Sequence, residues 1–154
     1  GALPEDGVIA RPLGKLTMVN CASPHYLTRF GYPQSPDDLT SHAIVRYTPH
    51  LGVHPLGFEV ASVNGVQWFK SGGMLTVNSS ENYLTAGLAG LGIIQIPRIA
   101  VREALRAGRL IEVLPGYRAE PLSLSLVYPQ RRELSRRVNL FMQWLAGVMK
   151  EYLD

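Results

Sequence analysis

Stretches with the pattern of a short β-strand are repeatedly followed, in this chain, by residues that start an α-helix. Residues 16–22 are mostly apolar and end at Ser23-Pro24, where a serine can cap a helix that begins with proline. Residues 74–77 run in the same way into Asn78-Ser79-Ser80-Glu81, with Asn78 as the predicted cap and Glu81 at the capping-box position. Strands that alternate with capped helices predict an α/β fold.

The remaining elements follow from periodicity and from turn residues. Asn64-Gly65 separates two strand patterns and favours a type I′ hairpin turn. Residues 93–96 are almost wholly apolar, which is typical of a strand inside a parallel sheet. Further strands are predicted over 43–47, 57–63, 66–70, 110–114 and 122–128, and further helices after Ser35, after Pro97 and, as the longest one, over 136–153. Residues 8–13 are expected to form an irregular or edge segment because prolines interrupt them.

Composition limits what such a chain can be. With 154 residues, 46% hydrophobic and 18% charged, it can form one domain or two small lobes with a real core. A net charge of +3 is too small and dispersed to make the chain a nucleic-acid binder by itself. The apolar run from Leu84 to Ile96 is interrupted by glycines and is too short to span a bilayer. The single cysteine leaves no intrachain disulfide and favours a reducing compartment.

The residues with catalytic potential do not form a recognisable constellation. Cys21 lies within a predicted strand, where we expect a buried structural thiol rather than a nucleophile. No Gly-x-Ser-x-Gly elbow surrounds Ser79 or Ser80, and the glycines at 87–92 follow a helix instead of a strand. The four histidines have no metal-ligand spacing. We therefore predict a protein that is not an enzyme and has no metal or cofactor.

A binding site is better supported. Asn78, Ser79 and Ser80 follow a strand and open a helix, so their hydroxyls and free N–H groups could receive a carboxylate or another anion. Plain helix capping explains the same residues equally well, and Ser23 has the same two interpretations. Four arginines around the start of the last helix are expected to form a solvated face rather than a nucleic-acid patch: Arg131, Arg132, Arg136 and Arg137.

Several ordered segments make the whole chain resemble the effector-binding domain of LysR-type transcriptional regulators. They are Leu3-Pro4-Glu5-Asp6, Ile9-Ala10-Arg11-Pro12-Leu13-Gly14, Cys21-Ala22-Ser23-Pro24-His25-Tyr26-Leu27, Pro33-Gln34-Ser35-Pro36-Asp37-Asp38-Leu39 with His42, Val77-Asn78-Ser79-Ser80-Glu81, Ala89-Gly90-Leu91-Gly92-Ile93 with Ile96-Pro97, and Val127-Tyr128-Pro129-Gln130-Arg131-Arg132 with Phe141 and Trp144-Leu145. Each segment is weak alone, but their order and spacing make the resemblance specific.

The resemblance implies a periplasmic-binding-protein-like fold of two α/β lobes joined by crossover strands, with a small-molecule effector in the cleft between them. One lobe would comprise residues 1–40 and 120–154 and would be incomplete, and the other would comprise 41–119. A complete domain of this family starts well before Gly1, and a winged helix-turn-helix that binds DNA precedes it. The implied protein is a cytoplasmic homodimer or homotetramer without a membrane segment.

The same resemblance raises the functional weight of seven residues. Ser23 would face the cleft from a strand end, Tyr47 and Thr48 would follow the first strand of the second lobe, and Asn78, Ser79 and Ser80 would face the cleft from the opposite helix. Tyr128 is as consistent with a hinge or core position as with a ligand contact. The alternative is a secreted solute receptor of a transporter, which would share the fold without a link to DNA.

Overall fold

The computed structural model describes residues 7–49, 57–73, 75–129 and 135–153. The chain forms two compact units: residues 18–120 make the larger one, and residues 1–17 with 121–154 make the smaller one. The strands are β1 (Val8–Leu16), β2 (Met18–Ala22), β3 (Arg46–Tyr47), β4 (Phe58–Ser62), β5 (Gly65–Phe69), β6 (Thr76–Val77), β7 (Ile94–Pro97), β8 (Ile111–Glu112) and β9 (Leu122–Pro129). The helices are α1 (Pro24–Phe30), the 3-10 helix η1 (Pro36–Ser41), α2 (Ser80–Leu88), α3 (Arg98–Arg106) and α4 (Arg136–Met149). The mixture confirms the predicted α/β class.

A three-stranded sheet in the order β7-β2-β8 lies at the centre of the larger unit. β2 pairs antiparallel with both neighbours, so Val19 lies opposite Ile96 and Cys21 opposite Ile94. Residues 93–96 were predicted to form a strand of a parallel sheet. The strand is present as β7, but it pairs antiparallel with β2, so the predicted direction of pairing was wrong within this sheet. Burial on both faces, rather than parallel pairing, explains their apolar composition.

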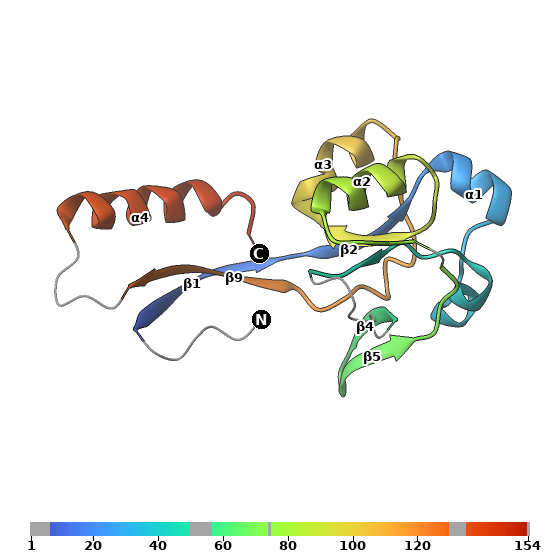
Figure 1. Ribbon diagram of the computed structural model, residues 1–154, viewed down its shortest axis with the longest axis horizontal. Helices are drawn as coiled ribbons and strands as arrows, with labels where there is room; N and C mark the ends of the chain where they lie inside the picture. Colours follow the sequence, from blue (N-terminus) through green and yellow to red (C-terminus); the bar gives the residue numbers. More distant parts are fainter. Residues whose placement is uncertain (1–6, 50–56, 74, 130–134, 154) are drawn as a thin grey trace. The chain divides into compact units, whose positions relative to one another are not determined.

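Two smaller strand pairs complete the larger unit. β3 and β6 run parallel, with Arg46 opposite Thr76 and Tyr47 opposite Val77. β4 and β5 form the predicted antiparallel hairpin, but the predicted type I′ turn at Asn64-Gly65 was wrong. Ser62 pairs with Gly65, so Val63 and Asn64 form the turn, and neither has the positive φ that a type I′ turn requires. Gly65, the first residue of β5, adopts a φ of 105°. Figure 1 shows α2 and α3 above the central sheet and the hairpin below it.

Two clusters of buried apolar side chains hold the larger unit together. The first joins β2 and β7 to α2 and α3 and includes Val19, Cys21, Ile94 and Val101. The second joins α1 and the hairpin through residues such as Leu27 and Phe58. Because apolar area removed from water is the dominant favourable term in folding, these clusters are the main source of the stability of this unit.

The helices start close to the predicted positions, but the capping residue of α2 and the type of the helix after Ser35 differ from the prediction. Ser79, not Asn78, caps α2 by accepting a hydrogen bond from the N–H of Asn82 at 3.4 Å, so Glu81 is not at the capping-box position. The helix after Ser35 is a 3-10 helix, in which Asp38 Oδ2 accepts from the N–H of Ser35 at 2.9 Å. The backbone N–H groups of Gln34 and Ser35 both donate to the Asp38 carboxylate, and these two hydrogen bonds hold the pKa of Asp38 below its ordinary value.

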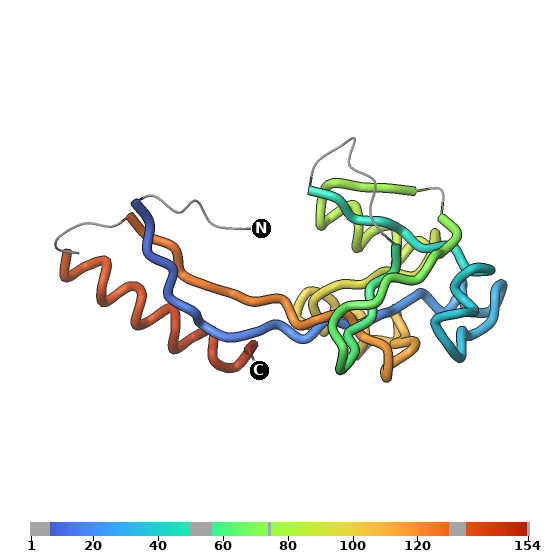
Figure 2. The backbone as a smooth tube through the Cα atoms, turned by 90° about the horizontal axis from the view of Figure 1, so that it is seen from below, coloured from blue at the N-terminus to red at the C-terminus, as the bar shows by residue number. Residues whose placement is uncertain are grey.

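The smaller unit consists of a two-stranded ribbon and one helix. β1 pairs antiparallel with β9 from Val8 opposite Pro129 to Leu16 opposite Leu122, with a shift of register between Pro12 and Gly14. The prediction of an irregular or edge segment over 8–13 is confirmed, because β1 is an edge strand of a two-stranded ribbon and carries a β-bulge next to its proline. Figure 2 shows α4 running alongside this ribbon, and Met142 is the buried residue on that helix.

Residues 18–40 belong to the larger compact unit, because β2 pairs with β7 and β8. The division into one lobe of 1–40 with 120–154 and another of 41–119 stays a prediction. Within the described residues, no helix is both long enough and apolar enough to cross a membrane.

Candidate functional site: a pocket in the larger unit

The parallel pairing of β3 and β6 brings most of the predicted site residues to one edge. The two strands end side by side, and the N–H of Thr48 donates to the carbonyl oxygen of Val77 at 2.9 Å. Tyr47 and Thr48 therefore lie beside the segment of Asn78, Ser79 and Ser80. The carboxyl ends of parallel strands are where α/β proteins usually place their ligands. Two sequence-predicted groups thus form one cluster in space.

The three residues at the start of α2 have different environments. Ser79 is half-buried and is used as the helix cap. Asn78 and Ser80 are exposed on either side of it. Capping therefore accounts for Ser79, while the side chains of Asn78 and Ser80 remain accessible next to the positive end of a nine-residue helix.

Ser23 and Tyr128 do not join this cluster. Ser23 is buried and caps α1, with its Oγ accepting from the N–H of Tyr26 at 3.2 Å. A Cβ added at Gly90 would lie 3.0 Å from that Oγ, so the serine is packed against the loop after α2. Tyr128 belongs to the smaller unit, where it is half-buried opposite Ile9 in the ribbon. Neither residue lines the pocket described next.

A pocket of about 360 Å³ opens in the larger unit beside the β3–β6 edge. Its lining includes the predicted Tyr47 and Thr48, together with Arg46, Glu59, Trp68 and Gln95. The volume falls within the range of small-molecule sites, and the mixture of aromatic rings with a few polar groups is typical of them. The pocket does not include Ser23, Asn78, Ser79, Ser80 or Tyr128.

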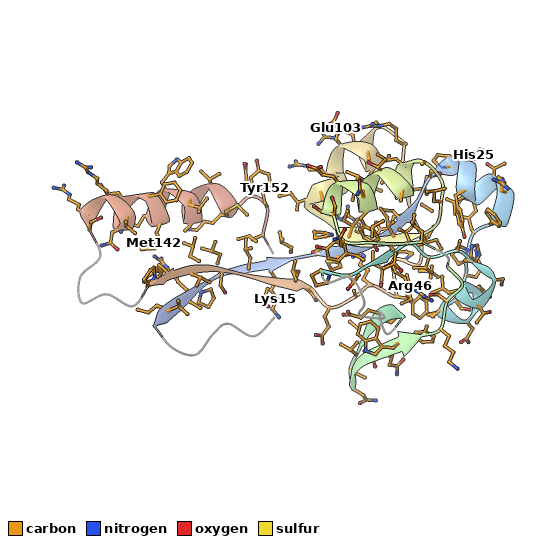
Figure 3. The ribbon with its side chains drawn as sticks, in the orientation of Figure 1. Lys15, His25, Arg46, Glu103, Met142 and Tyr152 are labelled. Atoms are coloured by element: carbon orange, nitrogen blue, oxygen red, sulfur yellow. The ribbon has the colours of Figure 1, made fainter. Side chains whose placement is uncertain are left out.

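Arg46 gives this pocket a positive charge. Its Nη2 donates to the carbonyl oxygen of Ser71 at 3.0 Å, while its buried Nε has no hydrogen-bond partner. The ion pairs found among the described residues are Arg98–Glu112 and Arg118–Glu112, and neither involves Arg46. Figure 3 labels Arg46 in the larger unit, near the hairpin. A partly buried guanidinium without an acidic partner favours binding of an anion.

Hydrogen bonds hold the polar wall of the pocket in place. Gln95 Nε2 donates to the carbonyl oxygen of Glu59 at 2.7 Å, and Gln95 Oε1 accepts from the N–H of Glu59 at 3.0 Å. The same Nε2 donates to Asn20 Oδ1 at 2.9 Å. Asn20 is fully buried and donates in turn to the carbonyl oxygens of Leu114 and Tyr117, at 3.2 and 2.8 Å. The network fixes the hairpin to the central sheet, so the wall is pre-organised.

An aromatic pair lies at the end of β3. The rings of Tyr47 and Tyr83 are 5.7 Å apart, and the hydroxyl of Tyr83 accepts from the N–H of Gln95 at 2.8 Å. Burial raises the pKa of Tyr83 well above its ordinary value, so this hydroxyl is neutral at physiological pH. Tyr83 therefore supports the pocket as a rigid neutral residue rather than as an acid or base.

Cys21 is buried in the first core cluster, as predicted for a structural thiol. Burial is the main reason that its pKa is raised to about 12, and the negative charge of Glu112 adds to the effect. A thiol of that pKa is not a nucleophile at neutral pH. Across the described ranges, no group of three His, Cys, Asp or Glu side chains could hold a metal ion.

Sequence reasoning missed five polar or aromatic residues of the pocket, which are Arg46, Glu59, Trp68, Tyr83 and Gln95. Arg46 directly precedes the predicted Tyr47, and a charged residue inside a short strand was the available signal for it. Trp68 lies in the hairpin strand β5 and pairs with Glu59, and both residues line the pocket. This pairing is not visible in the sequence. Gln95 interrupts an otherwise apolar strand, and that interruption indicated a functional or buried polar role. Met74, His50, His54, Arg131 and Arg132 lie outside the described residues.

The fold and the pocket fit an α/β domain of the periplasmic-binding-protein-like type, and comparison with known proteins agrees. The model of the LysR substrate binding domain family matches residues 1–150. This chain therefore belongs to the LysR substrate-binding domain family, as the sequence segments predicted, and the family is one of transcriptional regulators rather than enzymes.

Individual relatives support the assignment. The chain is 34% identical over 138 residues to an uncharacterised HTH-type transcriptional regulator of Haemophilus influenzae, covering 90% of this chain and 47% of the relative. It is 32% identical to an HTH-type transcriptional repressor of Pseudomonas aeruginosa, covering 98% and 48%. The regulatory domain of CrgA from Neisseria meningitidis matches with a TM-score of 0.80 at 26% identity, covering 96% of this chain and 72% of that one. The chain spans about half the length of these curated relatives.

Proposed function

We propose that this chain is part of the effector-sensing domain of a LysR-type transcriptional regulator and that its pocket binds a small anion, such as a carboxylate. The observation that carries the proposal is Arg46, a pocket-lining guanidinium that forms no ion pair among the described residues. Asn78, Ser79 and Ser80 support it, because they start α2 at the same strand edge and favour negative charge.

The larger unit is proposed as the second lobe and the smaller unit as part of the first. Ser23, in the larger unit, and Tyr128, in the smaller unit, remain proposed ligand contacts. An effector that prefers one arrangement of the lobes would shift an oligomer between two DNA-bound geometries. The regulator would bind DNA through a winged helix-turn-helix outside residues 1–154 and would act in the cytoplasm as a dimer or tetramer.

The competing proposal is a secreted solute receptor of a transporter, which shares the fold. The matched relatives are transcriptional regulators, and this favours the regulator. Reading the coding region upstream of Gly1 separates the two: a winged helix-turn-helix is expected, and an export signal without a DNA-binding domain would reject the regulator.

The anion site itself is tested by binding. Titration with benzoate and succinate is followed by the fluorescence of Trp68 in a Trp144→Phe background, because these are the two tryptophans of the chain. Arg46→Gln is expected to weaken binding at least tenfold, since a charge-assisted hydrogen bond contributes roughly 1.5–3 kcal/mol. Sodium chloride at matched ionic strength is the control, and no saturable response to either acid would overturn the anion proposal.

Ser80→Ala separates anion binding from capping at the start of α2. Because Ser79 provides the cap, Ser80→Ala is expected to leave the folded state unchanged while weakening carboxylate binding by roughly 1–2 kcal/mol. Ser123→Ala, at an exposed position of β9, is the matched control. If the folded Ser80→Ala variant binds the carboxylate with unchanged affinity, the proposed role of Asn78, Ser79 and Ser80 in anion binding is wrong, and helix capping is the role that remains.

A further inference from the structure

One face of the β4–β5 hairpin packs into the core, and the other face lines the pocket. Phe58 and Val60 on one face are buried in the second core cluster. On the other face Glu59 lies directly opposite Trp68, and both line the pocket. Alternation along paired strands fixes this division, because neighbouring side chains of a strand point to opposite faces. The hairpin is thus anchored by one face and presents a tryptophan to the pocket with the other.

Two of the pocket's aromatic side chains remain accessible. Trp68 is 46% exposed and Tyr47 is 44% exposed, and they come from different strand pairs. Behind Tyr47, the ring of Tyr83 is almost fully buried at 5.7 Å and fixes its position. Large aromatic surfaces that stay in water beside a pocket are available to a ligand, and burying them contributes favourably to binding.

Some polar groups of the pocket are already hydrogen-bonded within the protein, whereas others are available to a ligand. Glu59 Oε1 accepts from the N–H of Glu120 at 3.0 Å, and the Gln95 amide is bonded to the backbone of Glu59 and to Asn20. Arg46 is the charged residue of the lining that has no acidic partner among the described residues. The lining therefore combines one cation, Arg46, and one carboxylate, Glu59, that is bonded to the backbone, with exposed ring faces.

We propose that Trp68 and Tyr47 are specificity-determining residues that select an anion with a flat, unsaturated body over a saturated anion of equal size. The inference rests on the proposed anion site at Arg46. A pocket of about 360 Å³ accommodates a ring with a carboxylate. The ring lies against Trp68 or Tyr47, and the carboxylate lies at Arg46. Flat rings gain more than puckered ones because aromatic faces contribute beyond the area they bury.

The test compares benzoate with cyclohexanecarboxylate, which have the same charge and similar size but differ in flatness. Calorimetry on the full chain is expected to show benzoate binding about fivefold tighter, a ratio in the range of an aromatic pair contact. Trp68→Leu is expected to reduce that ratio to about one, whereas Trp68→Phe keeps most of it. Arg46→Gln weakens both acids and leaves their ratio unchanged.

The outcomes separate this inference from the proposed function. If both acids bind wild type equally, the anion site stands and the aromatic selection is wrong. A preference for benzoate that survives in both Trp68→Leu and Tyr47→Leu would also overturn the assignment to these two side chains. If neither acid nor succinate binds, the anion site itself fails. Circular dichroism of each variant, with Trp68→Phe as the conservative form, confirms that the hairpin is still folded.

Discussion

The two compact units bury their apolar side chains to very different extents. In the larger unit two clusters contain fully buried residues such as Val19, Phe58 and Ile93. In the described part of the smaller unit, Met142 is the buried hydrophobic residue. A two-stranded ribbon with one helix offers too little surface to enclose a core, because a hairpin alone is marginally stable. Local sequence patterns therefore account for the secondary structure of both units. Among the described residues, clusters of buried apolar side chains are found in the larger unit.

The exposed side chains of α4 show the same contrast. The sequence predicts an apolar stripe over Val138, Phe141, Met142, Leu145, Val148, Met149 and Tyr152. Phe141 is 56% exposed and its neighbour Trp144 is 60% exposed, with their rings 5.6 Å apart. Figure 3 shows Met142 pointing from α4 toward the ribbon. The stripe is therefore only partly covered.

The largest expected difference comes from two leucines. Leu39 is fully buried in the larger unit, and Leu140 is 56% exposed on α4. Leu39→Ala is expected to lower the free energy of unfolding by about 2–5 kcal/mol through lost burial and the cavity it leaves. Leu140→Ala should change it by less than about 0.5 kcal/mol. Urea unfolding measures both, followed at Trp68 in a Trp144→Phe background for Leu39→Ala and at Trp144 in a Trp68→Phe background for Leu140→Ala. Equal losses would contradict the difference in burial.

The second prediction concerns the buried amide that links the sheet to the pocket wall. Asn20→Ala removes a donor from the carbonyls of Leu114 and Tyr117 and the acceptor from one N–H of the Gln95 amide. Leu114 keeps the N–H of Tyr117, and Gln95 keeps its hydrogen bonds to Glu59. The expected loss is about 1–3 kcal/mol in the free energy of unfolding, because buried groups that lose a partner retain their desolvation penalty. Reaction of Cys21 with a thiol reagent provides an independent measure, since local opening exposes the only cysteine.

Asn82→Ala is the matched control for Asn20→Ala. Asn82 is exposed on α2, so its removal is expected to change stability by less than about 0.5 kcal/mol. If both variants unfold at the same urea concentration, the buried network does not stabilise the larger unit.

A smaller effect is expected from two serine caps, one in each unit. Ser23 Oγ accepts from the N–H of Tyr26 at 3.2 Å in a buried environment, and Ser135 Oγ accepts from that of Val138 at 3.4 Å in an exposed one. Ser23→Ala is expected to cost about 1–2 kcal/mol and Ser135→Ala about 0.5 kcal/mol or less. Unfolding followed separately at Trp68 and Trp144 measures each unit, and a larger effect at Ser135 would reverse the comparison.

The smallest effect is a dependence of stability on pH that belongs to the larger unit. All four histidines lie between residues 25 and 54, and His42 is buried with its Nδ1 3.0 Å from the Tyr26 hydroxyl. Burial lowers the pKa of His42, and the carboxylate of Asp38 opposes this only in part. The unfolded chain therefore binds a proton before the folded one as pH falls below about 6.5, and stability declines from there down to the lowered folded pKa.

His42→Gln is expected to remove that decline between about pH 6.5 and 5, where side chains of ordinary pKa other than histidine do not titrate. His25→Gln, at an exposed position of α1, should keep it. Thermal unfolding across this pH range makes the measurement, and an unchanged slope in His42→Gln would show that another group is responsible.

Much of the architecture could be predicted from local patterns. The hairpin of β4 and β5, the cap at Ser23 and the helix after Pro97 were predicted correctly because each depends on neighbouring residues, although the hairpin turns at Val63 and Asn64 instead of at Asn64-Gly65. The cap of α2 was placed one residue early, since Asn78, Ser79 and Ser80 are all good caps and packing chooses among them. The β1–β9 ribbon was missed in part, because a bulge at Pro12 is visible only when the partner strand is known.

The candidate site was predictable to a lesser degree. Tyr47 and Thr48 are among the residues that line the pocket. The roles of Ser23, Tyr47, Thr48, Asn78, Ser79, Ser80 and Tyr128 as ligand contacts stay predictions. Arg46 and Trp68 come from a short parallel strand and from a hairpin, and no sequence spacing relates them.

Local sequence patterns were enough to predict the α/β class, the presence of most helices and the family, because caps, turn residues and periodicity act over a few neighbouring positions. The structure was needed to show which unit β2 joins, that the apolar strand β7 pairs antiparallel with β2, and that Arg46 and Trp68 share a pocket. These outcomes depend on contacts between residues far apart in the chain, whose energies arise from burial and hydrogen bonding after the elements have come together.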